Sequence, residues 1–511
     1  MQQLEDEPRF SNSRATPLRL TPRLGQHHLL LGIIGVALVL RLVLSSRMTV
    51  FHADEVWQYL EPAYGLVTGS WVRAWEFHAG IRGWFVPLML SAPLALGHAL
   101  APQSQLHLWL VRTALSLLSL GVPWAWYDLA RRFGRTHALV AAWVGAVWCE
   151  VFYFAVRPSA EGIGLSLLFP AMALAQRLRS RARFHEAGAL GLLLALGFVV
   201  RFHYLPAIAL IALWSVGRNA RQVIPGLALG IASGLALGGF GDVVTGHPPL
   251  LWIWRSIAFN VVQGGSDMFG TQPPWWFVTY QGLTWSWATL LLVPLALIGA
   301  RRQPMLLAMA IAIYATHSLI AHKEYRFVLL GTTTLVLLAA IGSVDVWNIV
   351  SRKFRLSSSL ATPGLCLAWS MLSLVVGLSP IFGDYWNQGD IPFQSLVIAG
   401  EQPGICGFAM YEQPAHPALA MTMFNRPVPV LLFDGPEAPL EARAMVARYN
   451  VIEASQLNGP ALPPGFHRVG CRGEEYLNIE DRLQCIYVRS GTCQGSSGDF
   501  AYQPAIERRG K

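Results

Sequence analysis

Charged residues are scarce in this chain of 511 residues: they make up only 13% of it, against roughly 25% in ordinary soluble domains. Hydrophobic residues make up 53%, including 19 Trp and 24 Phe, and the mean hydropathy is +0.42. Such a composition is too apolar for one water-soluble core, which favours a polytopic membrane protein. No small-residue cleavage site follows the first apolar run, so we expect that run to be retained as an anchor.

Three further classes of protein lack their usual signals. The net charge of +9 would suit nucleic-acid binding, but no basic and aromatic face accompanies it, and the arginines instead gather at the ends of apolar runs. No internal repeat of the transporter type is visible. The cysteine spacing fits no zinc pattern. Four cysteines of the polar tail predict one or two disulfides; they are Cys406, Cys471, Cys485 and Cys493.

Long apolar runs dominate the first three quarters of the chain, and a spanning helix needs about 20 such residues. The runs cover 29–48, 83–100, 106–130, 136–155, 159–177, 187–201, 203–217, 222–240, 283–301, 304–321, 326–344 and 361–379. Runs 83–100 and 106–130 cannot both cross, because the basic cluster RRFGR (131–135) would then lie outside. We take 83–100, which contains Pro87 and Pro93, as the re-entrant or interfacial run. We therefore predict an all-α membrane protein with about 11 transmembrane helices.

The same distribution of basic residues predicts the domains. Residues 1–28 are expected to form a cytoplasmic tail, 29–379 a transmembrane catalytic domain, and 380–511 an extracytoplasmic domain. The last of these contains β-like runs such as VPVLLF (428–433) and CIYV (485–488), which predict a small α/β fold. The polar stretches on the outer side include 51–82, the RPSAEG turn (157–162), 241–282 and 322–326.

Two adjacent carboxylates, in FHADEVWQYLEP, follow the first apolar run. Asp54 at the start of a helix could cap it, with Glu55 favoured by the helix dipole. Such a cap does not explain the polar and aromatic helix that follows, which suits a membrane surface beside a polar cavity. A carboxylate at that boundary is also a candidate functional group.

Two other outer stretches combine charges and aromatics. SWVRAWEFHAGIRGWFVP (70–87) could hold a sugar by stacking and hydrogen bonds, although an interfacial aromatic belt would look similar. HKEYRF (322–327) could be a tight loop with a Lys323–Glu324 pair. Basic side chains on the outer face would also suit a phosphate ligand, with Arg201 as a second source of positive charge. Arg41, inside the first run, is expected to snorkel, to pair with a carboxylate, or both.

These motifs resemble those of the family 22 glycosyltransferases, the lipid-linked-mannose-dependent mannosyltransferases of GPI-anchor and N-glycan assembly. FHADEVWQYLEP resembles the "PDE-x-x-Q-x-hEP" loop of that family, AWEF and IRG resemble "TWEW…IRS", and HKEYRF resembles "HKEERF". FNVVQGGSDMFGTQPPWW (259–276) resembles its Trp-rich loop. The differences are Ala53 for Pro, Phe77 for Trp and Tyr325 for Glu.

The resemblance implies the GT-C fold and inverting transfer of mannose from a polyprenyl- or dolichyl-phosphate donor to a hydroxyl of a glycan or glycolipid. It implies catalytic roles for Asp54 and Glu55, with Asp54 as the base, more effective if partial burial raises its pKa. Donor-phosphate binding falls to His322, Lys323, Arg326 and Arg201. Sugar or acceptor binding falls to Gln58, Trp75, Glu76, Asn260, Trp275 and Trp276.

No cofactor, metal or nucleic acid is expected, and membrane lipids and the two lipid-linked substrates are the expected partners. The compact, arginine-rich sequence indicates a bacterial member, in the inner membrane with a periplasmic site; a eukaryotic member would lie in the endoplasmic reticulum. The alternatives are a related transferase using polyprenyl-phosphate glucose or arabinose, or a transporter or flippase. Mid-membrane charges at symmetric positions would favour a transporter, whereas the polar residues here gather at one face.

Overall fold

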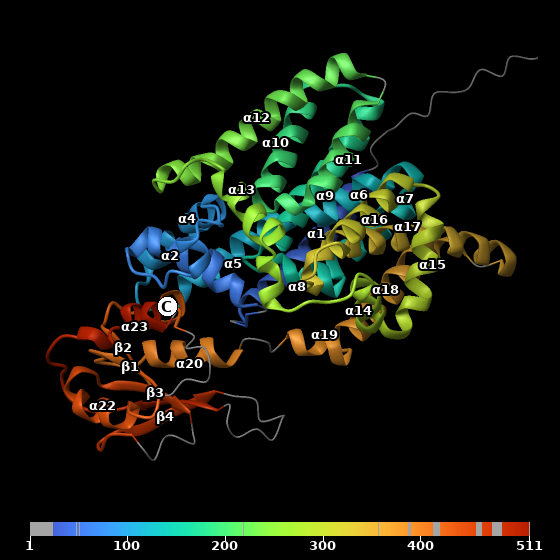
Figure 1. Ribbon diagram of the computed structural model, residues 1–511. Helices are drawn as coiled ribbons and strands as arrows, with labels where there is room; N and C mark the ends of the chain where they lie inside the picture. Colours follow the sequence, from blue (N-terminus) through green and yellow to red (C-terminus); the bar gives the residue numbers. More distant parts are fainter. Residues whose placement is uncertain are drawn as a thin grey trace, which may run out of the picture.

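The structure is a computed structural model that describes residues 24–47, 49–50, 52–217, 219–355, 357–386, 390–411, 419–455, 462–472 and 483–509. Figure 1 shows a large bundle of helices and, beside one end of it, a smaller part built around a sheet. Most of the predicted cytoplasmic tail, 1–28, lies outside the described residues. The strands of this smaller part all lie after residue 407.

Apolar helices build the bundle, as the hydrophobic runs predict. They are α1 (Leu24–Ser45), α4 (Phe85–Leu100), α5 (Leu106–Ser119), α6 (Gly121–Ala130), α7 (Arg135–Val147), α8 (Cys149–Ala155), α9 (Ala160–Ser180), α10 (Phe184–Val200), α11 (Leu205–Val216), α12 (Ala220–Val244), α14 (Trp276–Trp285), α15 (Thr289–Ala300), α16 (Pro304–Ser318), α17 (Leu329–Phe354) and α18 (Ala361–Gly377). Shorter helical segments carry the polar motifs. They are η1 (Glu55–Leu60), α2 (Glu61–Thr68), α3 (Trp75–His78), α13 (Leu251–Ile257), η7 (Tyr325–Val328) and α19 (Pro380–Tyr385).

Five stretches of helix are long and apolar enough to cross a membrane, by length and composition, within the described part of the chain. They are His27–Ser45, Leu106–Phe133, Ala220–Val244, Trp276–Ala300 and Tyr325–Phe354. A sixth appears if α7 and α8, which meet at 55°, form one span. The prediction of a helical integral membrane protein is confirmed. The count of about 11 crossings stays a prediction, as does the re-entrant placement of run 83–100, where α4 has 16 residues.

A buried arginine side chain contacts the bend between α7 and α8. Trp148 adopts an extended conformation (φ −66°, ψ 125°) and interrupts the helix. Arg41 of α1 is fully buried, and its guanidinium donates to the carbonyl oxygens of Ala146 (3.2 Å) and Gly145 (3.4 Å) and to the Ser119 hydroxyl (2.8 Å). Carbonyls released by the break are thus satisfied inside the protein. Arg41 therefore does not reach the interface, and it pairs with no carboxylate of the described residues. The expectation that it would do one or both is wrong.

The C-terminal part contains a five-stranded sheet in the order β2-β1-β3-β5-β4. Its strands are β1 (Phe408–Tyr411), β2 (Val430–Phe433), β3 (Val451–Ser455), β4 (His467–Arg472) and β5 (Gln484–Val488). The first three are parallel to one another, and β5 is antiparallel to both β3 and β4. The helices around this sheet are α20 (Asp390–Gly400), α21 (Met421–Phe424), α22 (Ala438–Ala444) and α23 (Tyr502–Arg509). The two runs predicted as strands are β2 and β5, which confirms the small α/β domain.

Two disulfides close this domain, which confirms the prediction drawn from its four cysteines. Cys406 pairs with Cys493, and Cys471 pairs with Cys485. The bridges enclose very different lengths of chain, with sequence separations of 87 and 14.

Loop length predicts which bridge stabilises the domain more. In the chain-entropy model, removing the Cys406–Cys493 bridge costs about 4.5 kcal/mol and removing Cys471–Cys485 about 3 kcal/mol. We expect the double variant C406S/C493S to have the lower melting temperature, measured by thermal unfolding of the purified protein. The variant C471S/C485S is the matched control, and an equal or reversed order would contradict this expectation.

The sheet domain is anchored to the segment after η1 by buried hydrogen bonds. Glu61 is fully buried; its carboxylate accepts from the Thr422 backbone N–H (2.7 Å), the Thr422 hydroxyl and the Val72 N–H (2.8 Å). The Tyr64 hydroxyl donates to Asn425 (3.0 Å). Since Glu61 begins α2, the same short segment both follows the paired carboxylates and holds the C-terminal domain in place.

Candidate active site

Polar side chains from four distant segments meet at one end of the bundle. Asp54 precedes η1, Glu161 lies in the first turn of α9, Arg201 ends α10, and Arg326 lies in η7 just before α17. We call these residues, together with His52, His322 and Glu324, the polar cluster. The predicted motifs FHADEVWQYLEP and HKEYRF are therefore neighbours in space.

Arg326 is the centre of the polar cluster. Its Nη2 lies 2.6 Å from Asp54 Oδ2, its Nε 2.6 Å from Glu324 Oε2, and its Nη1 3.9 Å from Glu161 Oε2. The Arg326 side chain is only 5% exposed. Glu161 in turn binds Arg201, with its Oε1 2.5 Å from the Arg201 Nη1. A buried guanidinium held by three carboxylates fixes their positions relative to one another.

The Asp54 carboxylate points to Arg326 rather than to the helix that follows it. Asp54 makes no side-chain capping hydrogen bond, so the helix-cap interpretation is wrong. Burial alone would raise the pKa of Asp54, but Arg326, His52 and Arg82 outweigh it and hold that pKa well below its usual range. The expectation of a base with a raised pKa is thus reversed, because the sequence could not show these partners.

Glu324 is held in the same way, between Arg326 and two histidines. Burial opposes ionisation, but Arg326 and His322 lower the pKa of Glu324 to about 2. His322 Nε2 lies 3.0 Å from Glu324 Oε1, and His52 Nε2 lies 3.6 Å from Glu324 Oε2. The alternative Lys323–Glu324 pair is not formed.

The two histidines give the polar cluster a pH dependence near neutrality. Burial and Arg326 lower the pKa of His52, but Asp54 and Glu324 outweigh them and raise it above 6.5. The hydrogen bond to Glu324 raises the pKa of His322. A raised folded-state pKa contributes stability that is present below pH 6.5 and is lost as the pH rises through the folded-state value.

Melting temperatures at two pH values test this. We expect wild-type protein to lose about 2 °C more than the H52Q/H322Q variant between pH 6 and pH 8.5, since partly exposed ion pairs contribute up to about 1 kcal/mol. A parallel change in both proteins would show that the histidines do not bind protons more tightly in the folded state. The exposed His467 of the sheet domain provides a control substitution, H467Q.

The residues predicted to bind the donor phosphate come together but already have partners. Arg201 pairs with Glu161, and Arg326 with three carboxylates. His322 contacts Glu324, and the Lys323 ammonium donates to the carbonyl oxygens of Gln272 (3.1 Å) and Ile320. Because of these contacts, all four side chains are directed at protein groups rather than into an open hollow.

The Glu55 side chain points away from that of Asp54, the residue before it in the sequence. It is 1% exposed and faces Arg157, whose Nη1 lies 3.4 Å from Glu55 Oε2. The same nitrogen donates to the Thr49 carbonyl oxygen (2.7 Å), which also accepts from Arg112 (2.6 Å). The structure thus separates the paired carboxylates: Asp54 enters the polar cluster, and Glu55 holds the segment before it.

The predicted sugar-binding residues lie in η1, in α3 and in the stretch 259–276. Gln58 Nε2 donates to Glu76 Oε1 (2.9 Å), and burial raises the pKa of Glu76 although Arg82 opposes this. Trp75 is 42% exposed and packs on Phe259 and Phe269, with ring centroids 5.4 and 6.0 Å away.

The loop 259–276 continues from there toward HKEYRF. The Asn260 amide donates to the Ser256 carbonyl oxygen of α13 (3.0 Å), while the Gln272 N–H donates to the Ala321 carbonyl (2.9 Å). Trp275 is 65% exposed, and Trp276 stacks on Tyr280 of α14, with centroids 4.6 Å apart. The Trp-rich loop therefore connects the stretch 70–87 to HKEYRF.

Two acids of the polar cluster were not assigned from the sequence, Glu161 and Glu324. Glu161 belongs to the RPSAEG turn, whose placement on the outer side was already a signal, because an acid at a membrane boundary is a functional candidate. The same holds for Glu324, which was considered only as a partner of Lys323. His52, two residues before Asp54, gave no signal of its own.

This fold resembles that of a solved membrane-protein structure, ArnT from Cupriavidus metallidurans. The structure bound to undecaprenyl phosphate aligns with a TM-score of 0.55 at 13% identity, covering 91% of this chain and 99% of ArnT. The apo structure aligns equally well, with a TM-score of 0.55. At this identity the likeness establishes the fold alone, which is the predicted GT-C fold.

Sequence relatives define the class more closely. "GPI mannosyltransferase 3" of Yarrowia lipolytica is 24% identical over 403 residues, which cover 75% of this chain and 73% of that protein. "GPI alpha-1,2-mannosyltransferase 3" of Xenopus laevis is 24% identical over 295 residues, covering 55% and 54%. A protein of Debaryomyces hansenii with the first of these names is 26% identical, covering 55% and 53%. The chain thus spans about half the length of two of these three relatives.

The model of the Alg9-like mannosyltransferase family matches residues 33–396. The chain belongs to this family, and the prediction of a glycosyltransferase of the mannosyltransferase class is confirmed. The match ends within α20, so most of the sheet domain lies beyond it.

Proposed function

We propose that this protein transfers mannose from a polyprenyl- or dolichyl-phosphate donor to a hydroxyl of a glycan or glycolipid, with inversion, on the outer face of the membrane. The Asp54–Arg326 ion pair carries the proposal, because it joins two polar motifs that are 272 residues apart in the sequence. A relative from Schizosaccharomyces pombe, 22% identical over 272 residues, is named for transfer from Dol-P-Man to a lipid-linked glycan, which supports this kind of donor and acceptor.

Asp54 is the proposed base. The acceptor oxygen forms a bond to the anomeric carbon while the carbon–oxygen bond to phosphate breaks, the electron pair leaves with the phosphate, and the hydroxyl proton passes to Asp54. Since the pKa of Asp54 is low, its carboxylate is ionised throughout the working pH range but is a weak base. Proton transfer is therefore late, after the forming bond has made the hydroxyl acidic.

The other polar-cluster residues are proposed to position Asp54. Arg326 holds its carboxylate at 2.6 Å, and Glu324 and Glu161 hold Arg326. Preorganisation of this kind avoids rearrangement during the reaction. We assign Arg326 to Asp54 rather than to the donor phosphate for this reason.

Acceptor binding is assigned to the exposed Trp75 and to the buried Gln58–Glu76 pair, of which Glu76 follows Trp75 in the sequence. Gln58 and Glu76 are hydrogen-bonded to each other, and Trp75 offers an exposed ring for stacking on a sugar. Glu76 takes the orienting role rather than Glu55, whose carboxylate faces Arg157. No metal is assigned a role, because guanidinium groups supply the positive charge.

Two membranes fit the proposal. The eukaryotic relatives fit the endoplasmic reticulum, and the compact arginine-rich sequence fits a bacterial inner membrane with a periplasmic site. The membrane helices and the family establish only that the protein is integral to a membrane.

A transfer assay tests the proposed function. Purified protein is incubated with β-linked polyprenyl-phosphate [14C]mannose and a lipid extract, and a labelled glycolipid is the expected product. Inversion predicts that α-mannosidase releases the label and that β-mannosidase does not. Absence of labelled product with intact donor would contradict the proposal, and release by β-mannosidase would contradict inversion. Parallel incubations with glucose- and arabinose-linked donors determine whether mannose is preferred.

A further inference from the structure

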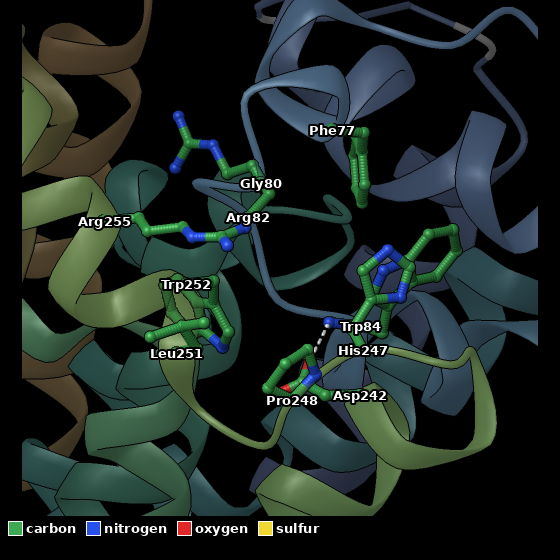
Figure 2. A pocket seen from close by; sticks show the side chains of 10 residues that line it. All are labelled: Phe77, Gly80, Arg82, Trp84, Asp242, His247, Pro248, Leu251, Trp252 and Arg255. Carbon is green, nitrogen blue, oxygen red and sulfur yellow. Dashed lines mark hydrogen bonds between the residues drawn. The ribbon is translucent and has the colours of Figure 1, made fainter.

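Two arginines outside the polar cluster face one hollow. Arg82 lies before α4 and Arg255 lies in α13; both line a hollow of about 320 Å³, measured out to its open mouth, together with Trp252, Asp242 and His247. Figure 2 shows the Arg82 and Arg255 side chains beside each other, with Trp252 below them in this view. The sequence analysis assigned no role to Arg255.

The positive charge of this hollow is poorly neutralised. No carboxylate of the described residues lies within 4 Å of the Arg255 guanidinium. The acid nearest to Arg82 is Glu76, whose Oε1 lies 4.0 Å from Arg82 Nη2, at the limit of an ion pair. The Arg82 Nε is buried and has no hydrogen-bond partner. Asp242 is occupied, because its two oxygens accept from the N–H groups of Trp84 (3.0 Å) and Leu250 (2.8 Å).

Close packing brings α13 against the loop that carries Arg82. Trp252 and Arg255 lie on one face of α13, and they contact Gly83 and Gly80, which have the same spacing in the facing loop. A Cβ on Gly83 would lie 2.4 Å from the Trp252 ring, so the approach of α13 depends on this glycine. A Cβ on Gly80, whose φ is +64°, would lie 2.5 Å from Arg255 Nη1, the end of a flexible and exposed side chain.

A second hollow, of about 360 Å³, continues from the first. It shares Arg82 and Trp252 and also contains Gln58, which is assigned to acceptor binding. Its apolar side consists of the partly exposed Phe85 and Trp252, over the buried Val86, Val199 and Val200. The two hollows thus share an arginine and a tryptophan where α4 begins and α10 ends.

We propose that Arg82 and Arg255 bind the phosphate of the lipid-linked donor, with its first prenyl units against Phe85 and Trp252, the partly exposed aromatic side chains of the second hollow. This inference rests on the proposed function and locates its donor site. Paired guanidinium groups with free N–H donors suit phosphate oxygens, and the adjoining apolar surface distinguishes a lipid phosphate from free phosphate.

The geometry of inversion supports this location over Arg326. In an inverting displacement the base and the leaving group lie on opposite faces of the sugar. A phosphate on Arg326 would lie beside Asp54, which Arg326 already contacts at 2.6 Å. Among the described residues Arg82 makes no ion pair with Asp54, so a phosphate on Arg82 would not compete with the Asp54–Arg326 pair.

Binding measurements on the purified protein in detergent test the proposal without any transfer step. The probes are undecaprenyl phosphate, undecaprenol and inorganic phosphate, and the variants are R255Q and R82Q. We expect R255Q to raise the Kd for undecaprenyl phosphate at least tenfold and to leave undecaprenol binding unchanged. Inorganic phosphate should bind far more weakly. R73Q is the matched control, because Arg73 lies in the same loop, stacks on Trp71 and does not line either hollow.

The outcomes separate this inference from the proposed function. Equal Kd values for R255Q and R73Q would overturn the phosphate site, and equally tight binding of inorganic and undecaprenyl phosphate would overturn the role of the prenyl chain. In transfer assays R255Q should raise the KM for the donor about tenfold, with kcat within threefold of wild type. Transfer with an unchanged KM would refute this site alone, whereas phosphate binding without any transfer would refute the proposed function alone.

Discussion

Replacing Asp54 with Asn is expected to lower kcat by about 10²- to 10⁴-fold, the usual contribution of a general base. Asn has nearly the same shape and can still accept a hydrogen bond from Arg326, so the KM for the donor should change less than threefold. Initial rates of mannose transfer at saturating donor and acceptor measure the effect. Melting temperature establishes that the variant is folded.

The control for this variant is D434N, which makes the same chemical change at an exposed position of the sheet domain. It should transfer mannose at the wild-type rate. A D54N variant with more than a tenth of wild-type kcat would remove Asp54 from the role of base. If H52Q then lost activity in its place, the neighbouring histidine would be the better candidate.

Replacing Arg326 with Met is expected to destabilise the protein by about 3–5 kcal/mol and to abolish transfer. The substitution leaves Asp54, Glu324 and Glu161 close together in a buried place without their common cation. Thermal unfolding and the transfer assay measure the two effects. Because loss of folding alone could abolish transfer, the double variant D54N/R326M is also needed.

That double variant removes one of the three carboxylates that lose Arg326, so part of the lost stability should return while transfer stays absent. The matched control is R302M. Arg302 also makes a two-point pair, with nitrogens 2.6 Å from both oxygens of Asp345, but it is 41% exposed, and an exposed pair contributes only about 0–1 kcal/mol. Equal melting temperatures for R326M and R302M would show that burial does not give the Arg326 pairs special weight.

The structural features that depend on composition were predicted correctly from the sequence. The helical membrane bundle, the C-terminal sheet and its disulfides all follow from apolar runs, alternating strands and cysteines in a polar tail. Membrane spans were harder to predict, because a helix break such as the one at Trp148 depends on a distant partner. Here the partner is Arg41, which satisfies the carbonyl groups released by the break. Helix α13 was missed, since seven residues with an Arg among them resemble a loop in sequence.

The sequence predicted which residues belong to the site better than it predicted which of them contact each other. Motif spacing brought Asp54 and Arg326 to one face of the membrane, but it could not tell which way neighbouring side chains point. Asp54 and Glu55 differ because the π-turn of η1 begins between them and Arg157 captures the second. The direction of the Asp54 pKa shift likewise depends on Arg326, a residue 272 positions away.

The buried bonds of Glu61 have a consequence for how this chain can be recombined. Glu61 lies seven residues after Asp54 and accepts from Thr422, beyond the end of the family match. A chimera that took its membrane domain from one relative and its sheet domain from another would break this contact at the start of α2, close to the loop that carries Asp54. A functional chimera therefore requires that the segment after η1 and the residues around Thr422 come from the same relative.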